Sequence, residues 1–340
     1  MSLSNLESFM RSVQADTQLQ ELQQPVRTEL DSLDQAMARF FESPLLILRG
    51  VSEHLLGVSG KRFRPTVLML IAKMGKSNPD DTVFAASVIE LIHTATLIHD
   101  DTIDRSAVRR GLPTLNALFN DQVSTILGDY IYTKAFVELI DRDLPKVVPV
   151  VARTTYRMTV GEVLAIEQKD DIDISEQDYF HLLNEKTASL MGASAEIGGL
   201  LGGMADEQVL ALHEFGEDLG RAYQVTDDLF DFVGDADQLG KGVASDLHAG
   251  KITLPLIYAM REEGSANRRF IRELARRQAC TDEEWIRLGR ILDESGALDY
   301  CRDKALQHAD SALTRLDFLP QGVHRSALEK AVAYAVNRVH

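Results

Sequence analysis

The stretch IHDDTIDRSAVRRG, residues 98–111, sets three aspartates and then three arginines at the end of an otherwise apolar run. Asp100, Asp101 and Asp104 form the pattern D-D-x-x-D. On a helix that turns about 100° per residue, the first and fifth members lie about 40° apart, so the carboxylates project from one side. Carboxylates this close repel one another unless something neutralises them, and Mg²⁺ prefers such hard oxygen ligands. The stretch therefore indicates a metal site that shares its ions with substrate phosphate oxygens.

The same pattern recurs 127 residues further on, at Asp227, Asp228 and Asp231 in YQVTDDLFDFVGD. A single copy in an acidic protein is more often a solvated surface patch, because Asp is mostly exposed. Two copies within apolar helical runs favour a paired metal site instead. Neither copy has the glycine-bearing, glutamate-terminated loop of a calcium-binding EF-hand.

Apolar residues recur at three- and four-residue intervals along nearly the whole chain, whereas alternating strand patterns are rare. We therefore expect an all-α fold. A long helix is expected over residues 82–104, and another begins near Ser175, which makes a loose capping box with Asp178. No Ser/Gly-rich linker divides the chain. One domain over residues 1–340 is expected, in which residues 1–25 form a helical, partly disordered N-terminal extension.

The composition is that of a globular protein of 340 residues, with 45% apolar residues and 36 Lys and Arg against 52 Asp and Glu. The net charge of −16 opposes sequence-independent attraction to nucleic acid, so an anionic ligand needs local basic residues or metal ions. Cys280 and Cys301 are too far apart for a metal knuckle. The sequence shows neither an N-terminal signal peptide nor a run of about 20 apolar residues. A cytoplasmic protein without a transmembrane segment is expected.

Basic residues gather in short motifs beside both triads, where a diphosphate would need them because carboxylates alone would repel it. They are Lys61, Arg62 and Arg64 in SGKRFRP, Arg109 and Arg110 after the first triad, Lys186 with Thr187 in NEKTASLMG, and Lys241 and Lys251 after the second triad. Any one of them alone is more often a surface charge than a ligand. His93 lies two turns before Asp100 on the same face, so it is either a structural histidine or a partner for a second anionic group.

These motifs, in this order, resemble those of the trans-polyprenyl diphosphate synthases, which are head-to-tail prenyltransferases. The resemblance covers most of the chain: GKRFRP near residue 60, ELIHTATLIHDDTID, RRGLPT, the GD at residues 128–129, EKTASL, YQVTDDLFDFVGD and DLHAGKITLPL. It implies the isoprenoid synthase fold, a single large helical bundle around a central substrate cavity. It also implies a homodimer, and several Mg²⁺ ions that bind together with substrate diphosphate.

The family pattern implies roles for individual residues of this chain. Mg²⁺ on the diphosphate of an allylic substrate would be held by Asp100, Asp101, Asp104, Asp227, Asp228 and Asp231. The same diphosphate would be bound by Arg109, Lys186, Thr187, Gln224, Lys241 and Lys251. Isopentenyl diphosphate would be held by Lys61, Arg64, His93 and Arg110, with Arg62 a weaker candidate. Catalysis would depend on Asp100, Asp101, Asp104, Lys186, Asp227 and Asp228.

The chemistry that the resemblance implies is electrostatic. Metal ions and cations stabilise the departing diphosphate while the allylic C–O bond breaks, and the double bond of isopentenyl diphosphate attacks the carbocation. A proton is then lost, and in this family the departed diphosphate is the usual base. No Ser-His-Asp or Cys-His arrangement is obvious in the sequence, and this reaction would not use one. Two positions depart from the family pattern: Arg105 replaces an acidic residue that many relatives have, and Ser59 replaces a second glycine.

Product length in this family depends on the residues four and five positions before the first aspartate, where bulky side chains stop the chain short. Thr96 and Ala95 occupy these positions, which resembles the longer-chain enzymes. Phe136 is a candidate for the floor of the product tunnel. Helical projection puts Ala95 about 140° from Asp100, so the tunnel role follows from the resemblance alone.

The leading hypothesis is an active synthase whose all-trans products are longer than farnesyl diphosphate, for example for a quinone side chain. A farnesyl or geranylgeranyl diphosphate synthase is the alternative. An enzyme that cyclises prenyl units or joins them head to head is disfavoured, because Lys61, Arg64 and His93 are all present. A catalytically silent regulatory subunit is disfavoured by the intact triads, and an acidic helical scaffold leaves their repetition unexplained.

Overall fold

Helices form almost all of the secondary structure in the computed structural model, which describes residues 17–42, 45–57, 60–109, 111–169, 171–233 and 245–337. The elements are η1 (Gln24–Val26), α2 (Arg27–Phe40), α3 (Leu46–Gly57), α4 (Phe63–Ala72), α5 (Pro79–Ile103), β1 (Val108–Arg109), β2 (Leu112–Pro113), α6 (Leu115–Leu118), α7 (Asp121–Asp141), α8 (Val147–Glu167), α9 (Glu176–Leu183), the π-helical turn η2 (Asn184–Ala188), α10 (Ser189–Leu201), α11 (Asp206–Val233), α12 (Ser245–His248), α13 (Leu254–Ala259), α14 (Ala266–Arg277), α15 (Asp282–Glu294), α16 (Ala297–Arg315) and α17 (Val323–Asn337). The all-α expectation is confirmed, and the hairpin β1–β2 is the only sheet among the described residues.

Helix α5, which carries the first triad, begins three residues earlier than expected. Asn78 caps it by accepting a hydrogen bond from the Asp80 N–H, and Pro79 occupies its first turn. By length and composition α5 could cross a membrane, but 67% of its apolar window is buried inside the fold, as in the core helix of a globular protein. The second expected helix begins as predicted, because the Ser175 side chain caps α9 by accepting from the Asp178 N–H.

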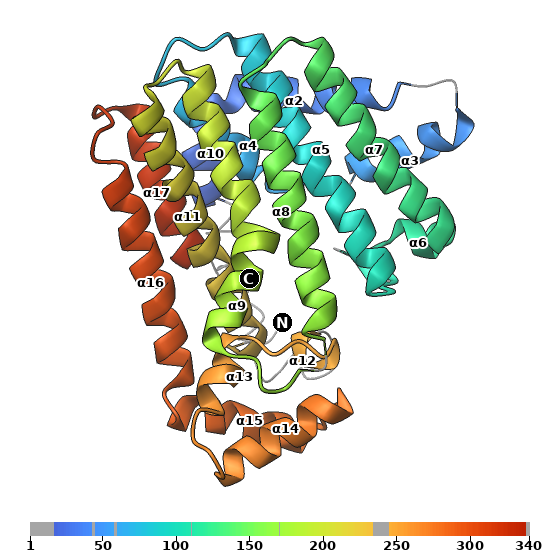
Figure 1. Cartoon of the computed structure of the whole chain (residues 1–340), viewed down its shortest axis with the longest axis vertical. Helices are drawn as coiled ribbons and strands as arrows, with labels where there is room; N and C mark the ends of the chain where they lie inside the picture. Colours follow the sequence, from blue (N-terminus) through green and yellow to red (C-terminus); the bar gives the residue numbers. More distant parts are fainter. Residues whose placement is uncertain are drawn as a thin grey trace.

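Two almost fully buried helices, α4 and α10, lie at the centre of the bundle. Both pack against α5, and α10 also packs along α11 and α8. Helices α2, α7, α16 and α17 add to this centre from outside (Figure 1). Because α5, α8 and α11 all run toward the same lower end of the bundle, the charged residues near their C-termini meet there (Figure 1).

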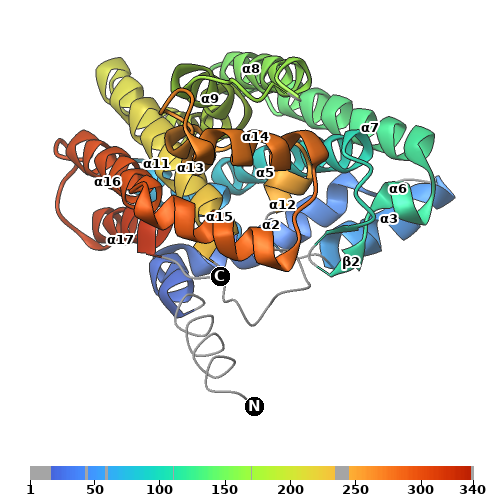
Figure 2. The ribbon, with the colours of Figure 1, turned by 90° about the horizontal axis from the view of Figure 1, so that it is seen from below.

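A smaller group of helices covers this lower end. Helices α14 and α15 cross it, with α12 and α13 between them and the main bundle (Figures 1 and 2). They have a core of their own, to which Ile271, Leu274, Leu288 and Leu292 contribute. Helices α12 to α15 therefore cover the end of the bundle where the two aspartate triads lie (Figure 1).

Candidate active site

The first triad lies at the C-terminal end of α5, and two of its carboxylates form ion pairs with basic side chains of the protein. Arg109 of β1 donates through Nε to both carboxylate oxygens of Asp101, at 2.9 and 2.8 Å. Lys186 of η2 donates to Asp100 Oδ1 at 3.1 Å and to Glu162 Oε2 of α8 at 2.9 Å. The structure thus brings Lys186 and Arg109 to the first triad, and their expected contacts with a diphosphate stay a prediction.

Glu162 is a site residue that sequence reasoning missed. Burial, followed by the charge of the nearby Asp100 carboxylate, raises its pKa to about 7 against the lowering effect of Lys186. For Lys186 itself, burial alone would lower the pKa, but Asp100 and Glu162 raise it above its usual value. Lys186 is therefore a charged ammonium between two carboxylates.

The second triad lies near the C-terminal end of α11, where Asp228 is buried. Its carboxylate accepts hydrogen bonds from the Tyr179 hydroxyl at 2.5 Å and from Gln224 Nε2 at 2.8 Å. Burial, followed by the charge of Asp246, raises its pKa to about 7 in spite of these two donors. Tyr179 is a second residue that the sequence did not single out, because a tyrosine on an apolar helix face looks like a core residue.

Asp246 of α12 is the third missed residue, and it links the two triads. Its N–H donates to Asp231 Oδ2 at 3.1 Å. Burial and the charge of Asp231 raise its pKa to about 6, with smaller contributions from Asp227 and Asp104 and an opposing one from Lys251. The sequence carried a signal, since Asp246 precedes Lys251 by five residues in DLHAGK.

Lys251, which follows Asp246 by five residues, forms an ion pair with the first triad, with its Nζ 3.4 Å from Asp104 Oδ2. Both side chains are partly exposed, so this ion pair is weak and easily exchanged.

The donor set fits Mg²⁺. Carboxylates of Asp100 and Asp104 on one side and of Asp227, Asp231 and Asp246 on the other are hard oxygen ligands that repel one another without a cation. No three acidic, His or Cys side chains among the described residues are already grouped as a metal site. The present neutralising charges are those of the protein's own lysines and arginines.

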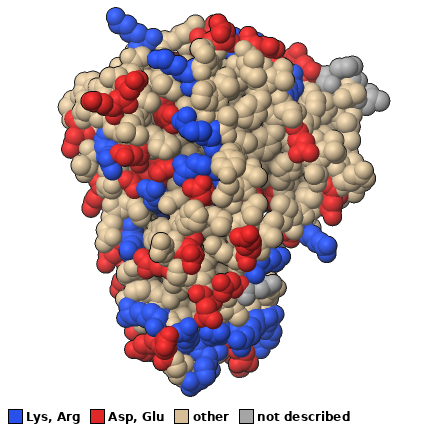
Figure 3. Space-filling view, viewed as in Figure 1, with Lys and Arg blue, Asp and Glu red and all other residues tan. Residues whose placement is uncertain are grey.

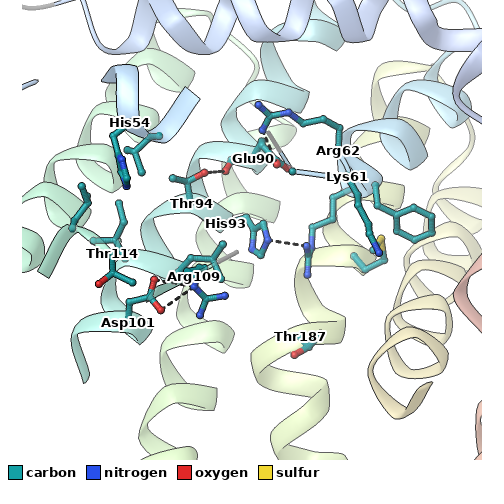
Figure 4. Close-up of a pocket in the computed structure, with 18 of the residues that line it drawn as sticks. His54, Lys61, Arg62, Glu90, His93, Thr94, Asp101, Arg109, Thr114 and Thr187 are labelled. Atoms are coloured by element: carbon teal, nitrogen blue, oxygen red, sulfur yellow. Dashed lines mark hydrogen bonds and ion pairs between the residues drawn. The ribbon is translucent and has the colours of Figure 1, made fainter. Parts of the chain in front are cut away.

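The residues expected to hold isopentenyl diphosphate, here called the isopentenyl-side residues, are Lys61, Arg62, Arg64, His93 and Arg110. The first four line a cavity of about 140 Å³. Lys61, Arg64, His93 and Arg109 line it together with Asp101. Arg64 Nη1 lies 3.2 Å from His93 Nε2, and Figure 4 shows His93 near Arg109 among the side chains that line the cavity. His54 of α3 and Thr94 also line this cavity, although the sequence did not point to them.

Arg62 lines the same cavity, but its guanidinium is engaged elsewhere. Nη1 donates to Glu90 Oε1 and Nη2 to Asp34 Oδ1, both at 2.9 Å. Its backbone is left-handed, with φ of 49°, directly before α4. Arg62 thus ties α4 to α5 and α2, which fits its weaker standing as a diphosphate ligand.

Four of the residues expected to bind the allylic diphosphate line a second cavity of about 240 Å³. Lys186, Gln224 and Lys251 face it, as do Asp104, Asp228 and Asp246. Arg109, expected with this group, lines the first cavity instead. Thr187 lines both cavities, so they meet at η2.

The residues expected to set chain length lie away from both cavities. Ala95 is fully buried in α5, and the Thr96 hydroxyl donates to the His93 carbonyl. Phe136 of α7 is partly buried against the core. None of the three lines either cavity, so their role stays a prediction.

Three positions remain from the sequence analysis. Arg110, Lys241 and Ser59 lie outside the described residues. Arg105 is exposed and has φ of 51°, directly after the last residues of α5. Its position corresponds to the left-handed turn that ends the helix, and no site contact of its side chain is observed.

Comparison with known proteins agrees with this geometry. A family model described as polyprenyl synthetase matches residues 46–288, which is more than half of the chain. The chain is 34% identical over 321 residues to an all-trans-nonaprenyl-diphosphate synthase (geranyl-diphosphate specific) of Rhodobacter capsulatus, covering 94% of this chain and 98% of that protein. It is 34% identical over 320 residues to the octaprenyl diphosphate synthase of Escherichia coli, covering 94% and 99%.

A solved structure has the same fold. It is a polyprenyl synthase from Caulobacter crescentus complexed with calcium and isoprenyl diphosphate, with a TM-score of 0.87 at 30% identity over 94% of this chain and 98% of that chain. Together with the family match and the paired aspartate triads, this likeness shows that the chain belongs to the polyprenyl synthetase family.

Proposed function

We propose that this chain is a Mg²⁺-dependent prenyltransferase that condenses isopentenyl diphosphate head to tail with an allylic diphosphate. The observation that carries the proposal is the pair of cavities that meet at Thr187. One is lined by cations that suit a diphosphate, and the other combines cations with carboxylates that suit a metal-bound diphosphate. Two diphosphate substrates could therefore lie side by side.

The allylic diphosphate would occupy the larger cavity. Lys186 and Lys251 would exchange their carboxylate partners for its oxygens, while the Thr187 hydroxyl and the Gln224 amide would donate hydrogen bonds. Mg²⁺ held by the two triads and Asp246 would supply the positive charge that stabilises the departing diphosphate. The count of ions is left to experiment, and Asp246 joins the six aspartates as a proposed ligand.

Isopentenyl diphosphate would lie in the smaller cavity, with its diphosphate on Lys61, Arg64 and His93. The allylic C–O bond breaks and its electron pair leaves with the diphosphate. The double bond of isopentenyl diphosphate then forms the new C–C bond, and the resulting cation loses a proton to the departed diphosphate. Apolar residues beside this cavity, such as Leu97 and Met191, would keep water from the cation.

Products longer than farnesyl diphosphate are supported by two observations. The relatives described above are named for octaprenyl and nonaprenyl products. Ala95 also places a small side chain on the helix that leads to the first triad. A farnesyl or geranylgeranyl synthase and a silent regulatory subunit remain the alternatives for the test.

The test is chromatography of the products made by the purified chain from isopentenyl diphosphate, geranyl or farnesyl diphosphate and Mg²⁺. Products of many isoprene units support the proposal. Products that stop at three or four units would select the short-chain alternative. If the protein alone releases no diphosphate with any starter, the regulatory role would be favoured.

A homodimer is proposed from the exposed apolar side chains of α7 and α8. They are Ile126, Val137 and Ile140 on α7 and Tyr156, Val163 and Ile166 on α8. Figure 3 shows a broad area without charge where these two helices lie. A second copy would cover it, because such an area is large for a monomer. Light scattering after size-exclusion chromatography tests the homodimer, and a monomeric mass would refute it.

We also propose a cytoplasmic location and one domain over residues 1–340.

A further inference from the structure

The lysine at the centre of the site is carried by an unusual piece of backbone. Between α9 and α10, η2 makes one π-helical turn that includes Lys186 and Thr187. Single π-helical turns are rare and often occur at functional sites, since the wider turn redirects its side chains. We propose that Arg157 of α8 is a positioning residue, which holds this turn through Glu185 and so aims Lys186 at the allylic diphosphate. The inference rests on the proposed function.

Arg157 binds η2 with two of the three nitrogens of its guanidinium. Its Nε lies 3.1 Å from both carboxylate oxygens of Glu185, and Nη2 donates to Glu185 Oε1 at 3.0 Å. Nη2 also reaches the Asn184 carbonyl at 3.5 Å, and Nη1 donates to Glu217 of α11 at 2.5 Å. The planar fork of an arginine can hold such an arrangement, whereas a lysine can make only point contacts.

Helix α11 holds the same turn from its other side. Arg221 donates through Nε to the Asn184 side-chain oxygen at 2.5 Å and through Nη2 to Glu217 Oε2 at 2.9 Å. Glu217 is therefore shared by two arginines, one from each helix. His213 adds a third cation, with Nε2 3.3 Å from Glu217 and Nδ1 3.0 Å from Glu196 of α10.

The backbone of η2 is also fixed by two close approaches at glycines. A Cβ added to Gly161 of α8 would lie 2.6 Å from the Lys186 nitrogen and 2.7 Å from its Cα. A Cβ added to Gly220 of α11 would lie 2.8 Å from the Ala188 Cα. The turn is thus enclosed by two helix backbones at contact distance, which leaves it little freedom to shift.

Residues on two consecutive turns of α8 position Lys186. On α8, Arg157 binds Glu185, Gly161 contacts the Lys186 backbone, and Glu162 accepts from the Lys186 ammonium. The backbone of Lys186 therefore cannot shift without moving α8 or breaking the Arg157–Glu185 fork, and the Glu162 carboxylate holds the ammonium beside Asp100. Displacing a charged group by about 1 Å at a reacting centre can cost about 100-fold in rate, so this geometry matters for turnover.

A purely structural role is the competing interpretation, because a buried charge network can serve stability or specificity alone. The two interpretations differ in what they change. Loss of stability lowers the amount of active enzyme and leaves the affinity of the remaining enzyme for each substrate unchanged. Misplacement of Lys186 weakens the affinity for the allylic diphosphate in particular. It spares isopentenyl diphosphate, whose proposed ligands Lys61, Arg64 and His93 lie just before α4, on α4 and on α5.

The test compares Arg157→Lys with Arg153→Lys in the full chain. Arg153 is the matched control, since it lies one turn earlier on α8, is largely exposed and pairs with Glu196 alone. For each variant we would measure the KM for both substrates, and the affinity for inorganic diphosphate with Mg²⁺ by calorimetry. Arg157→Lys is expected to raise the allylic KM and weaken diphosphate binding by about tenfold or more, with the isopentenyl KM within about twofold. The control is expected to match the wild type in all three.

Glu185→Ala removes the other half of the fork and is expected to show the same split. It replaces Arg157→Lys if that variant has melted at the assay temperature, as followed by circular dichroism. Equal KM values and diphosphate affinities in the folded Arg157→Lys or Glu185→Ala variant and in the control would overturn the positioning role. If wild type and control make no product, the proposed function fails, while calorimetry still tests the placement of Lys186.

Discussion

The contact of Lys186 with two carboxylates predicts that a second substitution can restore the stability lost in a Lys186 variant without restoring its activity. In Lys186→Met the ammonium is lost, and Asp100 and Glu162 face each other without a cation between them. The side chains of the three residues are only 18–27% exposed, so water screens them incompletely. Glu162→Gln removes one of the two facing carboxylates while keeping the shape of the side chain. The measurements are made well above pH 7, because the pKa of Glu162 is raised to about 7 even with Lys186 present and rises further without it. Combining the two changes tests whether the repulsion is real.

The expected magnitudes follow from the burial of the pair. Removing one partner of a fully buried ion pair costs about 3–5 kcal/mol. Partial exposure reduces this, so we expect Lys186→Met to lower the free energy of unfolding by about 2–3 kcal/mol. Adding Glu162→Gln should return about 1–2 kcal/mol, which is the size of coupling seen between charges in one network. Activity should not return, because the ammonium of Lys186 is still missing from the diphosphate site, and kcat should stay at least about 100-fold below wild type.

The assay combines urea unfolding of all four proteins with steady-state kinetics at saturating Mg²⁺. The four unfolding free energies form a double-mutant cycle, from which the coupling energy is read directly. A double variant no more stable than Lys186→Met would show that Asp100 and Glu162 do not repel each other. Turnover in Lys186→Met near that of the wild type would refute the role of Lys186 in binding the allylic diphosphate.

Three further predictions follow from individual contacts. Ala95→Phe tests the chain-length role that the family resemblance implies: a ring that meets the growing chain should shorten the main product by several isoprene units, whereas an unchanged product length on chromatography would show that Ala95 does not face the product. Tyr179→Phe removes a hydrogen bond to Asp228 worth about 1.5–3 kcal/mol, so the Mg²⁺ concentration for half-maximal turnover should rise about tenfold or more, and an unchanged titration would contradict the contact. Two nearby carboxylates raise the pKa of His213 from 6.5 to about 9, so its stabilisation is complete below pH 6.5 and is lost as the pH rises to about 9. Although burial would raise the pKa of Glu217, His213 and an arginine lower it from 4.5 to about 2, so its stabilisation is complete above pH 4.5 and is lost toward pH 2. Melting temperatures should therefore fall from pH 6.5 to 9, and His213→Gln should flatten this fall, whereas parallel profiles would exclude the histidine as its cause.

The helices and the family could be predicted from the sequence because both are written in local patterns. Three- and four-residue spacing of apolar side chains gives α5 and α11, and the cap Ser175 marks where α9 begins. The two aspartate triads and the basic motifs are equally local, since their chemistry depends on residue type and short spacing. These features led to the polyprenyl synthase resemblance that the comparisons bear out.

The partners within the site could not be predicted in this way, because they are joined by tertiary packing. Asp100 and Lys186 are 86 residues apart, and Asp104 and Lys251 are 147 apart. Glu162 and Tyr179 carry no distinctive spacing, and Asp246 is marked only by its nearness to Lys251 in the sequence. The approach of α8, α9 and α12 to the triads makes all three part of the site.

By itself the sequence determined that this protein is an all-helical member of its family with two carboxylate clusters and enough local cations for two diphosphates. Only the tertiary structure decided that Arg62 ties helices together, that Arg109 lies with the isopentenyl-side residues and that a π-helical turn carries Lys186. The physical reason is that charge and helix propensity are properties of short segments. The direction in which a charged side chain points depends on which other helices pack against its own.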